Sequence, residues 1–475
     1  MFFNSYEFIF EFLPAACAVY FLLAKAPRVG TWWLVAASLF FYSFHRAHSL
    51  WLLPASISFN YALSLLLVRQ RRKAYLVLGI VANLLVLAVF KYKVALGGAL
   101  GSGQTWWSAL SGLTFPLGIS FYTFSQISYL VDTYRGQDSP SSLGDYALFV
   151  TFFPHLLSGP ILRHREMIPQ FDSVRRRRLI PRYLARGSAL IIIGLVKKVL
   201  IADPLAPLVA KAFDSTGALD AGTAWLGAAA YTFQLYNDFS GYCDIAVGVA
   251  YLLNLRIPEN FRAPYRSTSI QEFWRRWHIS LSNWLRDYVY YSLPGMRSKW
   301  KIFPYLNAVI TMLVCGLWHG LGWTFVVWGL FHGIALATCA YWRRLRRHMP
   351  DVLGWALTFA FVSLSWVIFR AKDLPASLRV YRAMFSAFPW SPLTAWWNTS
   401  GLALLRHPVD AWSPEADLGR LALLVAALAV AVPSYSYVLA RTMKPSVWTA
   451  CLGATLLTIC VLRFSSASYF LYAFF

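Results

Sequence analysis

Two histidines of this 475-residue chain stand where an imidazole could do chemistry, His278 and His319. His319 lies between the apolar runs 308–318 and 323–330. An ionisable side chain is expensive to keep in an apolar environment, so a functional role is its default interpretation. A neutral imidazole in a site of low dielectric can take a proton from a hydroxyl or a thiol that attacks an acyl group, and it is the usual general base at neutral pH.

Glycines surround His319 and favour an unusual backbone there. Gly316, Gly320 and Gly322 would permit a broken helix or the close approach of a substrate. His332 comes 13 residues later. On one continuous helix the two rings would point about 220° apart and could not line one pocket. We therefore expect His319 to be functional and His332 structural, with a hydrogen-bonded core histidine as the alternative for His319.

His278 belongs to a second polar block, EFWRRWHISLSNWLRDYVYYSLPG at 272–295. On a single helix, one face of this block would carry Trp274, His278, Leu281 and Leu285. The charged residues would be spread over the other faces, so we expect this helix to lie at the membrane interface or to line a polar cavity. His278 could then orient a substrate or share the proton with His319.

Four further polar side chains could line a pocket or a cofactor entrance: Asp238, Arg276, Asn283 and Arg286. Asp238 lies in the sequence YNDFSGYCD at 236–244, in which small residues separate two carboxylates. Ion pairing inside the membrane is the alternative role for the charged members of this set.

Signatures of several common enzyme classes are missing. The chain has no G-x-S-x-G, H-E-x-x-H, P-loop or G-x-G-x-x-G motif, which disfavours a serine hydrolase, a zinc protease and a nucleotide-hydrolysing transporter. Its six cysteines stand singly in apolar segments, without metal-ligand spacing. We therefore expect neither a metal site nor disulfide bonds.

The composition indicates which elements must position these side chains. Hydrophobic residues make up 58% of the chain and charged residues 13%, so the apolar surface exceeds what one soluble core could bury. Segments of roughly 20 apolar residues, enough to cross a hydrocarbon core of about 30 Å, recur throughout. The candidates are residues 6–24, 32–44, 50–68, 74–90, 109–131, 144–162, 188–210, 222–236, 240–255, 304–318, 321–342, 353–370, 420–438 and 447–464. We predict an all-α, polytopic integral membrane protein with roughly 11–13 transmembrane or re-entrant helices.

The formal charge of +23 reflects membrane topology rather than nucleic-acid binding. The cations form short clusters between apolar runs, at 71–73, 175–178 and 343–347. Such clusters are typical of cytoplasmic loops under the positive-inside rule. We expect membrane lipids as surroundings and no nucleic-acid partner.

Domain organisation is expected to be simple. We predict a single membrane-embedded domain over residues 1–475, because no repeat of fixed period and no flanking soluble domain is visible. A polar insert at 382–419 would cap one membrane face, and an aromatic tail covers 465–475. The N-terminal residues lack a basic region and a cleavage site, so we expect the first helix to be retained.

Four motifs together resemble one known family. They are TFFPHLLSGPILRH at 151–164, LYNDFSGYCDIAVG at 235–248, FRAPYRSTSIQEFWRRWHISLSNWLRDYVY at 261–290 and LWHG at 317–320. In this order they closely resemble the membrane-bound O-acyltransferase family, and within it the alginate or cellulose O-acetyltransferase-like branch. The similarity in character covers most of the chain.

The resemblance implies roles for both histidines. His319 matches the near-invariant catalytic histidine of the family, and His278 matches its second motif histidine. After the second histidine, the alginate branch has a segment like P-L-G-G-N-R, whereas this chain has SLPGMR at 292–297. That departure leaves the acceptor polymer open and does not touch the acyl chemistry.

The sequence SYFLYAFF at 468–475 adds a candidate acyl relay. Phe470, Tyr472 and Phe475 fit an F-x-Y-x-x-F pattern that resembles the motif of acyl-shuttling partners of this family. A phenol, with a pKa of about 10, leaves more readily than a sugar hydroxyl, so an O-acetyl-tyrosine would keep the acetyl group reactive. The alternative is that Tyr472 belongs to an aromatic belt at the membrane interface.

The resemblance therefore implies an enzyme of the bacterial inner membrane that takes acetyl from cytoplasmic acetyl-coenzyme A. The acetyl group would move across the membrane towards a periplasmic SGNH-like acetyltransferase partner, beside a polysaccharide synthase complex, for O-acetylation of an exopolysaccharide. Two alternatives remain: a family member with another acyl donor or acceptor, such as a D-alanyl group or a lipid or protein, and a polysaccharide or lipid transporter.

Overall fold

The computed structural model describes residues 1–44, 50–100, 116–171, 178–294, 302–386, isolated positions between 421 and 430, 435–464 and 470–471; for 93–100 it describes the backbone alone. Within these residues the secondary structure is helical throughout, which confirms the all-α prediction. The described helices include α1 (Leu13–Leu22), α2 (Pro27–Ser43), α3 (Leu52–Arg69), α9 (His164–Phe171), α11 (Asp203–Phe213), α18 (Leu374–Phe385), α22 (Ser436–Thr442) and α23 (Val447–Leu462).

The membrane-spanning class is confirmed as well. Five helical stretches in the described part are long and apolar enough to cross a bilayer: Glu7–Lys25, Leu52–Arg69, Lys73–Tyr92, Trp323–Arg344 and Asp351–Arg370. Two shorter apolar helices are Phe303–His319 and Val447–Leu462. The stretch Glu7–Lys25 contains α1. The stretches Trp323–Arg344 and Asp351–Arg370 are α16 and α17.

Several other predicted spans form shorter or interrupted helices. The segment 144–162 divides into α7 (Leu143–Thr151) and α8 (Phe153–Leu156), and 188–210 runs from α10 (Pro181–Leu195) through a π-helical segment, Val196–Ala202, into α11. The separate spans predicted at 222–236 and 240–255 are wrong, because both lie in one helix, α12 (Ala221–Leu252). The glycine at 241 does not interrupt it.

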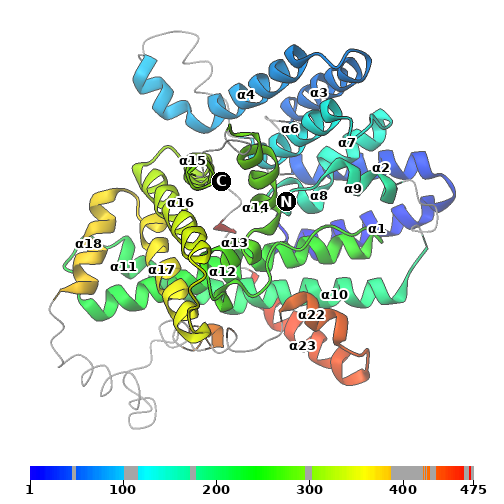
Figure 1. Cartoon of the computed structure of the whole chain (residues 1–475). Helices are drawn as coiled ribbons and strands as arrows, with labels where there is room; N and C mark the ends of the chain where they lie inside the picture. Colours follow the sequence, from blue (N-terminus) through cyan, green and yellow to red (C-terminus); the bar gives the residue numbers. More distant parts are fainter. Residues whose placement is uncertain are drawn as a thin grey trace.

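Helix α12 is the central element of the fold and packs against α10 and α11, in the lower half of Figure 1. Glycines let α10 and α12 approach closely. A Cβ added at Gly194 would lie 2.5 Å from the Gly241 carbonyl oxygen, and one at Gly248 would lie 2.7 Å from the Gly187 oxygen. This close contact fixes the position of the polar residues that α12 carries.

The hairpin of α15 (Phe303–His319) and α16 carries His319. A Cβ at Gly316 would lie 2.3 Å from the Phe325 carbonyl oxygen, so the two helices pack backbone against backbone. Helix α15 ends at His319, and residues 320–322 make the turn. The assumption of one continuous helix through His319 and His332 is therefore wrong, and the broken helix that the glycines permitted is what forms.

The block around His278 is also broken. Helix α13 (Ile270–Arg276) ends before Trp277, and α14 (Ile279–Trp284) begins after His278, which has φ 44° and ψ 54°. A π-helical segment, Leu285–Val289, continues from α14. The predicted single helix, with Trp274, His278, Leu281 and Leu285 on one face, is thus wrong. Left-handed backbone is costly for a histidine, so the surrounding contacts must hold it there.

Candidate active site around His319

Aromatic rings enclose the imidazole of His319, whose residue is only 5% exposed. Its ring centroid lies 5.0 Å from that of Phe369, 5.4 Å from that of Trp328, 4.6 Å from that of Trp318 and 6.3 Å from that of Phe325. We call these four residues the aromatic cage. It excludes bulk water, which strengthens any electrostatic interaction that a reacting group makes inside.

Lys91 brings a positive charge to the same place. It lies on α4 (Lys73–Leu100), and its Nζ donates a hydrogen bond to the backbone oxygen of Trp318. The ammonium also lies 5.0 Å from the centroid of the Trp318 ring. Next to it, the Tyr92 hydroxyl donates to the Leu317 oxygen at 2.5 Å. Helix α4 therefore holds the last turn of α15, the turn that ends at His319.

His278 is the second candidate imidazole, and its ring packs on Phe239 with centroids 4.8 Å apart. Its residue is 1% exposed, and its Nδ1 lies 3.3 Å from Asn260 Oδ1. That oxygen also accepts hydrogen bonds from the backbone N–H and the hydroxyl of Ser280. Because the amide oxygen can only accept, a neutral His278 carries its proton on Nδ1, and the lone pair is on Nε2.

His332 has the surroundings of a structural histidine, as predicted. The Trp274 indole donates to His332 Nδ1 at 3.2 Å, and Nε2 lies 2.9 Å from the Ser365 hydroxyl. That hydroxyl donates to the Val362 backbone oxygen. Both ring nitrogens are therefore used within the core. His332 and His319 nevertheless both contact the ring of Trp328, at centroid distances of 4.7 Å and 5.4 Å.

A cavity of about 300 Å³ adjoins the aromatic cage. Phe325 and Phe369 belong to both, and the cavity wall also includes Arg370 and Leu471. We call it the tail cavity, because Leu471 comes from the far end of the chain. A group bound in it would lie against two of the rings that pack on His319.

Asp238 holds this distant segment in place. Its Oδ2 accepts a hydrogen bond from the Leu471 backbone N–H at 2.9 Å, and its Oδ1 pairs with Lys198 at 2.7 Å. Lys198 also pairs with Asp203 and lies 4.9 Å from the centroid of the Phe470 ring. The structure therefore places Asp238 beside the tail cavity and gives it an ion pair.

The other predicted entrance residues do not gather around His319. Arg276 pairs with Glu272 at 2.6 Å, one helical turn away, and Arg286 pairs with the adjacent Asp287 at 2.7 Å. Asn283 is half-buried on α14. Tyr472 lies outside the described residues, as do Phe475 and most of the polar insert at 382–419.

Four residues close to this centre were not singled out from the sequence: Lys91, Lys198, Asn260 and Phe369. The sequence could have indicated the two lysines, because a cation inside an apolar run is as costly to bury as the imidazole of His319. Asn260 and Phe369 carry no such signal, since their importance comes from neighbours distant in sequence. Among the described residues, no group of three or more His, Cys, Asp or Glu side chains is arranged to hold a metal ion.

Comparison with known proteins adds the family context. A model of the membrane-bound O-acyltransferase family matches residues 15–372. A peptidoglycan O-acetyltransferase of Helicobacter pylori is 42% identical over 420 residues, which cover 80% of this chain and 79% of the relative. A probable alginate O-acetylase of Azotobacter vinelandii is 43% identical over 406 residues, covering 82% and 79%. A teichoic acid D-alanyltransferase of Streptococcus thermophilus is 32% identical over 282 residues, covering 53% and 68%.

Proposed function

Because this chain belongs to the membrane-bound O-acyltransferase family, and so is a multi-pass membrane O-acyltransferase, we propose that it moves acetyl groups from cytoplasmic acetyl-coenzyme A towards an exported polysaccharide. The main support is the position of His319 at the end of α15, inside the aromatic cage and next to a cavity. The O-acetyltransferase relatives match about four fifths of the chain, and the D-alanyltransferase about half. Acetyl is therefore the favoured acyl group.

The proposed reaction is an ordinary acyl transfer. An acceptor hydroxyl attacks the thioester carbonyl, and His319 takes the hydroxyl proton as the new C–O bond forms. The C–S bond then breaks, and the proton passes to the leaving thiolate, which departs as the free thiol of coenzyme A. His278, with its lone pair on Nε2, is proposed to orient the acceptor or share the proton.

The acceptor polymer is proposed to be alginate-like or a cell-wall polymer. The names of the relatives refer to alginate and peptidoglycan, which favours these over cellulose. The bacterial relatives also support the inner membrane as the location. A periplasmic SGNH-like acetyltransferase and a polysaccharide synthase complex are the proposed partners, since the final transfer to a long polymer needs a site outside the bilayer.

A test of the catalytic assignment is His319→Ala in the purified protein, reconstituted in nanodiscs with acetyl-coenzyme A. We expect release of free coenzyme A to fall by at least about a hundredfold, the usual scale for loss of a general base. His348→Ala is the matched control, because His348 is an exposed histidine after α16. Wild-type thiol release in His319→Ala, with normal thermal unfolding, would remove His319 from the mechanism.

Tyr472 is proposed as the acyl relay between the two transfers. It follows Leu471 directly in the chain, and Leu471 lines the tail cavity. In the first transfer its phenol oxygen would gain the acetyl group. In the second, a nucleophile of the periplasmic partner would attack the acetyl carbonyl, the bond to the phenol oxygen would break, and the phenol would regain a proton. Tyr472→Phe should yield no acetylated peptide from residues 465–475 in mass spectrometry and should stop polymer acetylation. Full polymer acetylation in this variant would assign Tyr472 to an interfacial aromatic belt instead.

A further inference from the structure

A second cavity, of about 360 Å³, lies away from His319 and is lined by arginines. Its wall includes Arg135 at the end of α6 (Ile119–Arg135), Arg163 and Arg165 around the start of α9, and Tyr288 in the π-helical segment after α14. We call it the arginine pocket. Its elements come from three separate parts of the chain, so it exists only in the folded protein.

The pocket carries an excess of positive charge. Arg163 pairs with Asp287, which also pairs with Arg286 at the rim. Asp132, the other acidic residue of the wall, accepts a hydrogen bond from the Tyr288 hydroxyl at 2.7 Å. Arg135 and Arg165 are exposed, and neither has a carboxylate partner among the described residues. Two guanidinium groups therefore remain available for an anion, and guanidinium matches phosphate in planar, bidentate geometry.

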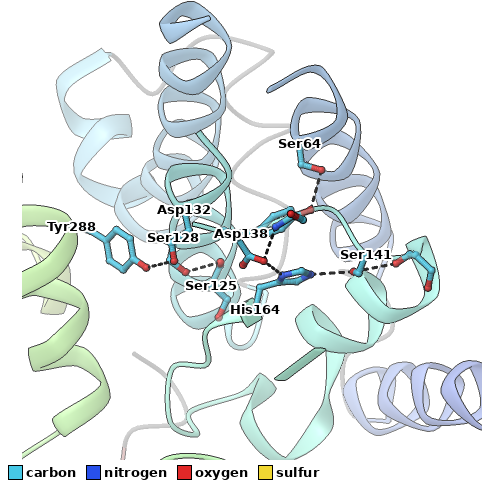
Figure 2. Close-up of polar contacts among 11 residues, drawn as sticks. Ser64, Ser125, Ser128, Asp132, Asp138, Ser141, His164 and Tyr288 are labelled. Carbon is cyan, nitrogen blue, oxygen red and sulfur yellow. Dashed lines mark hydrogen bonds and ion pairs between the residues drawn. The ribbon is translucent and has the colours of Figure 1, made fainter. Parts of the chain in front are cut away.

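Figure 2 shows a network of polar contacts that includes Asp132 and Tyr288 of the pocket wall and the nearby His164. His164, between Arg163 and Arg165, has Nδ1 2.9 Å from Asp138 Oδ1 and Nε2 3.0 Å from the Ser141 hydroxyl. These contacts join α9 to the segment that follows Arg135. The backbone that carries Arg163 and Arg165 is thus held in place beside the segment that follows Arg135.

The contacts from Ser141 to His164 and from His164 to Asp138 also resemble those of a catalytic triad, in which a base lies between a nucleophile and an orienting carboxylate. The imidazole, however, packs against Tyr129 and Phe149, with ring centroids 4.4 Å and 5.3 Å away, and its residue is 2% exposed. A base that serves a substrate needs an approach to its nucleophile. We therefore assign this set a structural role in holding the arginines.

The arginine pocket lies at the end of the molecule that the positive-inside rule assigns to the cytoplasm. The Arg71 guanidinium packs against Gly136, which directly follows Arg135 and has φ 71°. Arg71 belongs to the basic cluster 71–73 between α3 and α4. Because such clusters stay on the cytoplasmic side, the pocket faces the compartment that holds acyl thioesters of coenzyme A.

Contacting aromatic rings connect the arginine pocket with His319. Ring centroids are 5.4 Å apart for Tyr288 and Trp284, 4.2 Å for Trp284 and Phe124, and 5.3 Å for Phe124 and Trp318. Trp318 belongs to the aromatic cage. Helix α15 also runs from the region of the arginine pocket to His319. It starts beside Tyr290, whose hydroxyl donates to the Pro304 oxygen, and it ends at His319. At 1.5 Å per residue its 17 residues span roughly 25 Å.

We propose that the arginine pocket binds phosphate groups of the acyl donor, with Arg135 and Arg165 as the contacts, while the thioester arm extends along this row of rings to His319. The inference deepens the proposed function and rests on it. It assigns the donor's charged end to a site at the other end of this row of rings from His319. A phosphate bound in the arginine pocket neutralises its excess positive charge. A donor without phosphates would lose only the contacts with Arg135 and Arg165.

The test compares two donors, acetyl-coenzyme A and S-acetyl-pantetheine, which lacks the phosphates. Arg135→Gln and Arg165→Gln should each raise the KM for acetyl-coenzyme A by about tenfold, with kcat within about twofold, because a charge-assisted hydrogen bond contributes on the order of 1.5 kcal/mol or more. The KM for S-acetyl-pantetheine should not change. Arg182→Gln, at an exposed arginine in the first turn of α10, is the matched control.

Calorimetric binding of coenzyme A supplies a second readout that does not depend on turnover. The glutamine variants should bind it about tenfold more weakly, and Arg165→Lys should fall between wild type and Arg165→Gln. An unchanged KM and unchanged binding in both glutamine variants would overturn the proposal. The proposal would also be overturned if the rise in KM in the glutamine variants disappeared when anionic lipid is removed from the nanodiscs. In that case the pocket binds a lipid headgroup. If the wild type itself does not turn over acetyl-coenzyme A, the proposed function fails instead.

Discussion

At the scale of single residues, the environment of His319 suits the acyl transfer that we propose for it. The aromatic cage keeps water from the imidazole, and Lys91 supplies a fixed positive charge within the same small volume. A cation placed in advance costs no reorganisation when negative charge develops on a carbonyl oxygen. The pair of His319 and Lys91 therefore suits acyl transfer better than a histidine alone.

Lys91→Met tests the contribution of this cation. The variant loses the hydrogen bond to the Trp318 oxygen that holds the last turn of α15. A small misplacement of a catalytic group can cost about a hundredfold in rate, so we expect kcat to fall by about ten- to a hundredfold, with a smaller change in KM. Steady-state thiol release measures both constants.

The control for this prediction is Lys91→Arg, which retains the charge and the donor and should keep most of the activity. If Lys91→Met has the kcat of wild type, the ammonium neither positions His319 nor stabilises the reacting group. Thermal unfolding of both variants separates a loss of rate from a loss of fold.

At the scale of elements, interrupted helices position the candidate functional side chains. His319 ends α15, His278 lies between α13 and α14, and Lys198 lies in a π-helical segment between α10 and α11. Side chains at such breaks can turn away from the regular faces of a helix, and π-segments are frequent at functional sites. Unbroken helices such as α12 instead provide the rigid frame, because close glycine contacts fix their distance from neighbours.

The N-terminus of α12 gives a prediction that depends on pH. Asp220 caps this helix, since its carboxylate accepts from the Thr223 hydroxyl at 2.6 Å and from the Thr223 backbone N–H at 2.9 Å. These hydrogen bonds hold the pKa of Asp220 below its usual range. The cap is therefore present at neutral pH and is lost as the pH falls through this lowered pKa.

Asp220→Ala should lower the free energy of unfolding by about 1 kcal/mol at pH 7, the typical contribution of an N-cap. The difference from wild type should shrink as the pH falls to the range where the carboxylate is protonated. Thermal unfolding in one detergent across this pH range measures it, with Asp220→Asn as a control that can still cap. A difference that persists in acid would show that the carboxylate charge is not what stabilises the cap.

At the scale of the whole molecule, both cavities depend on segments that are distant in sequence. Leu471 meets Asp238 of α12 across 233 positions, and Trp284 of the third motif packs on Phe124 of α6. The arginine pocket and the tail cavity lie towards opposite ends of the α15–α16 hairpin, with His319 adjoining the latter. A donor and an acceptor could therefore reach one histidine from two sides.

Leu471→Pro tests whether the distant segment takes part. Proline has no backbone N–H, so the hydrogen bond to Asp238 is lost, whereas Leu471→Ala keeps it. If the hydrogen bond contributes about 1.4 kcal/mol, its loss corresponds to a factor of ten. We therefore expect polymer acetylation in cells to fall by roughly tenfold for the proline variant and much less for the alanine variant. Equal activity of the two variants would show that this hydrogen bond has no role in the transfer.

The sequence by itself determined the family and the helical membrane class, and it singled out His319 and His278 as candidates. These follow from local patterns, because apolar length, the cost of a buried ionisable group and the four motifs are all readable along the chain. Only the tertiary structure decided that α13 and α14 break at His278, that Asp238 contacts Leu471 and that Lys91 lies beside Trp318. Long-range packing sets these contacts, and no pattern of neighbouring residues encodes which distant side chains will meet.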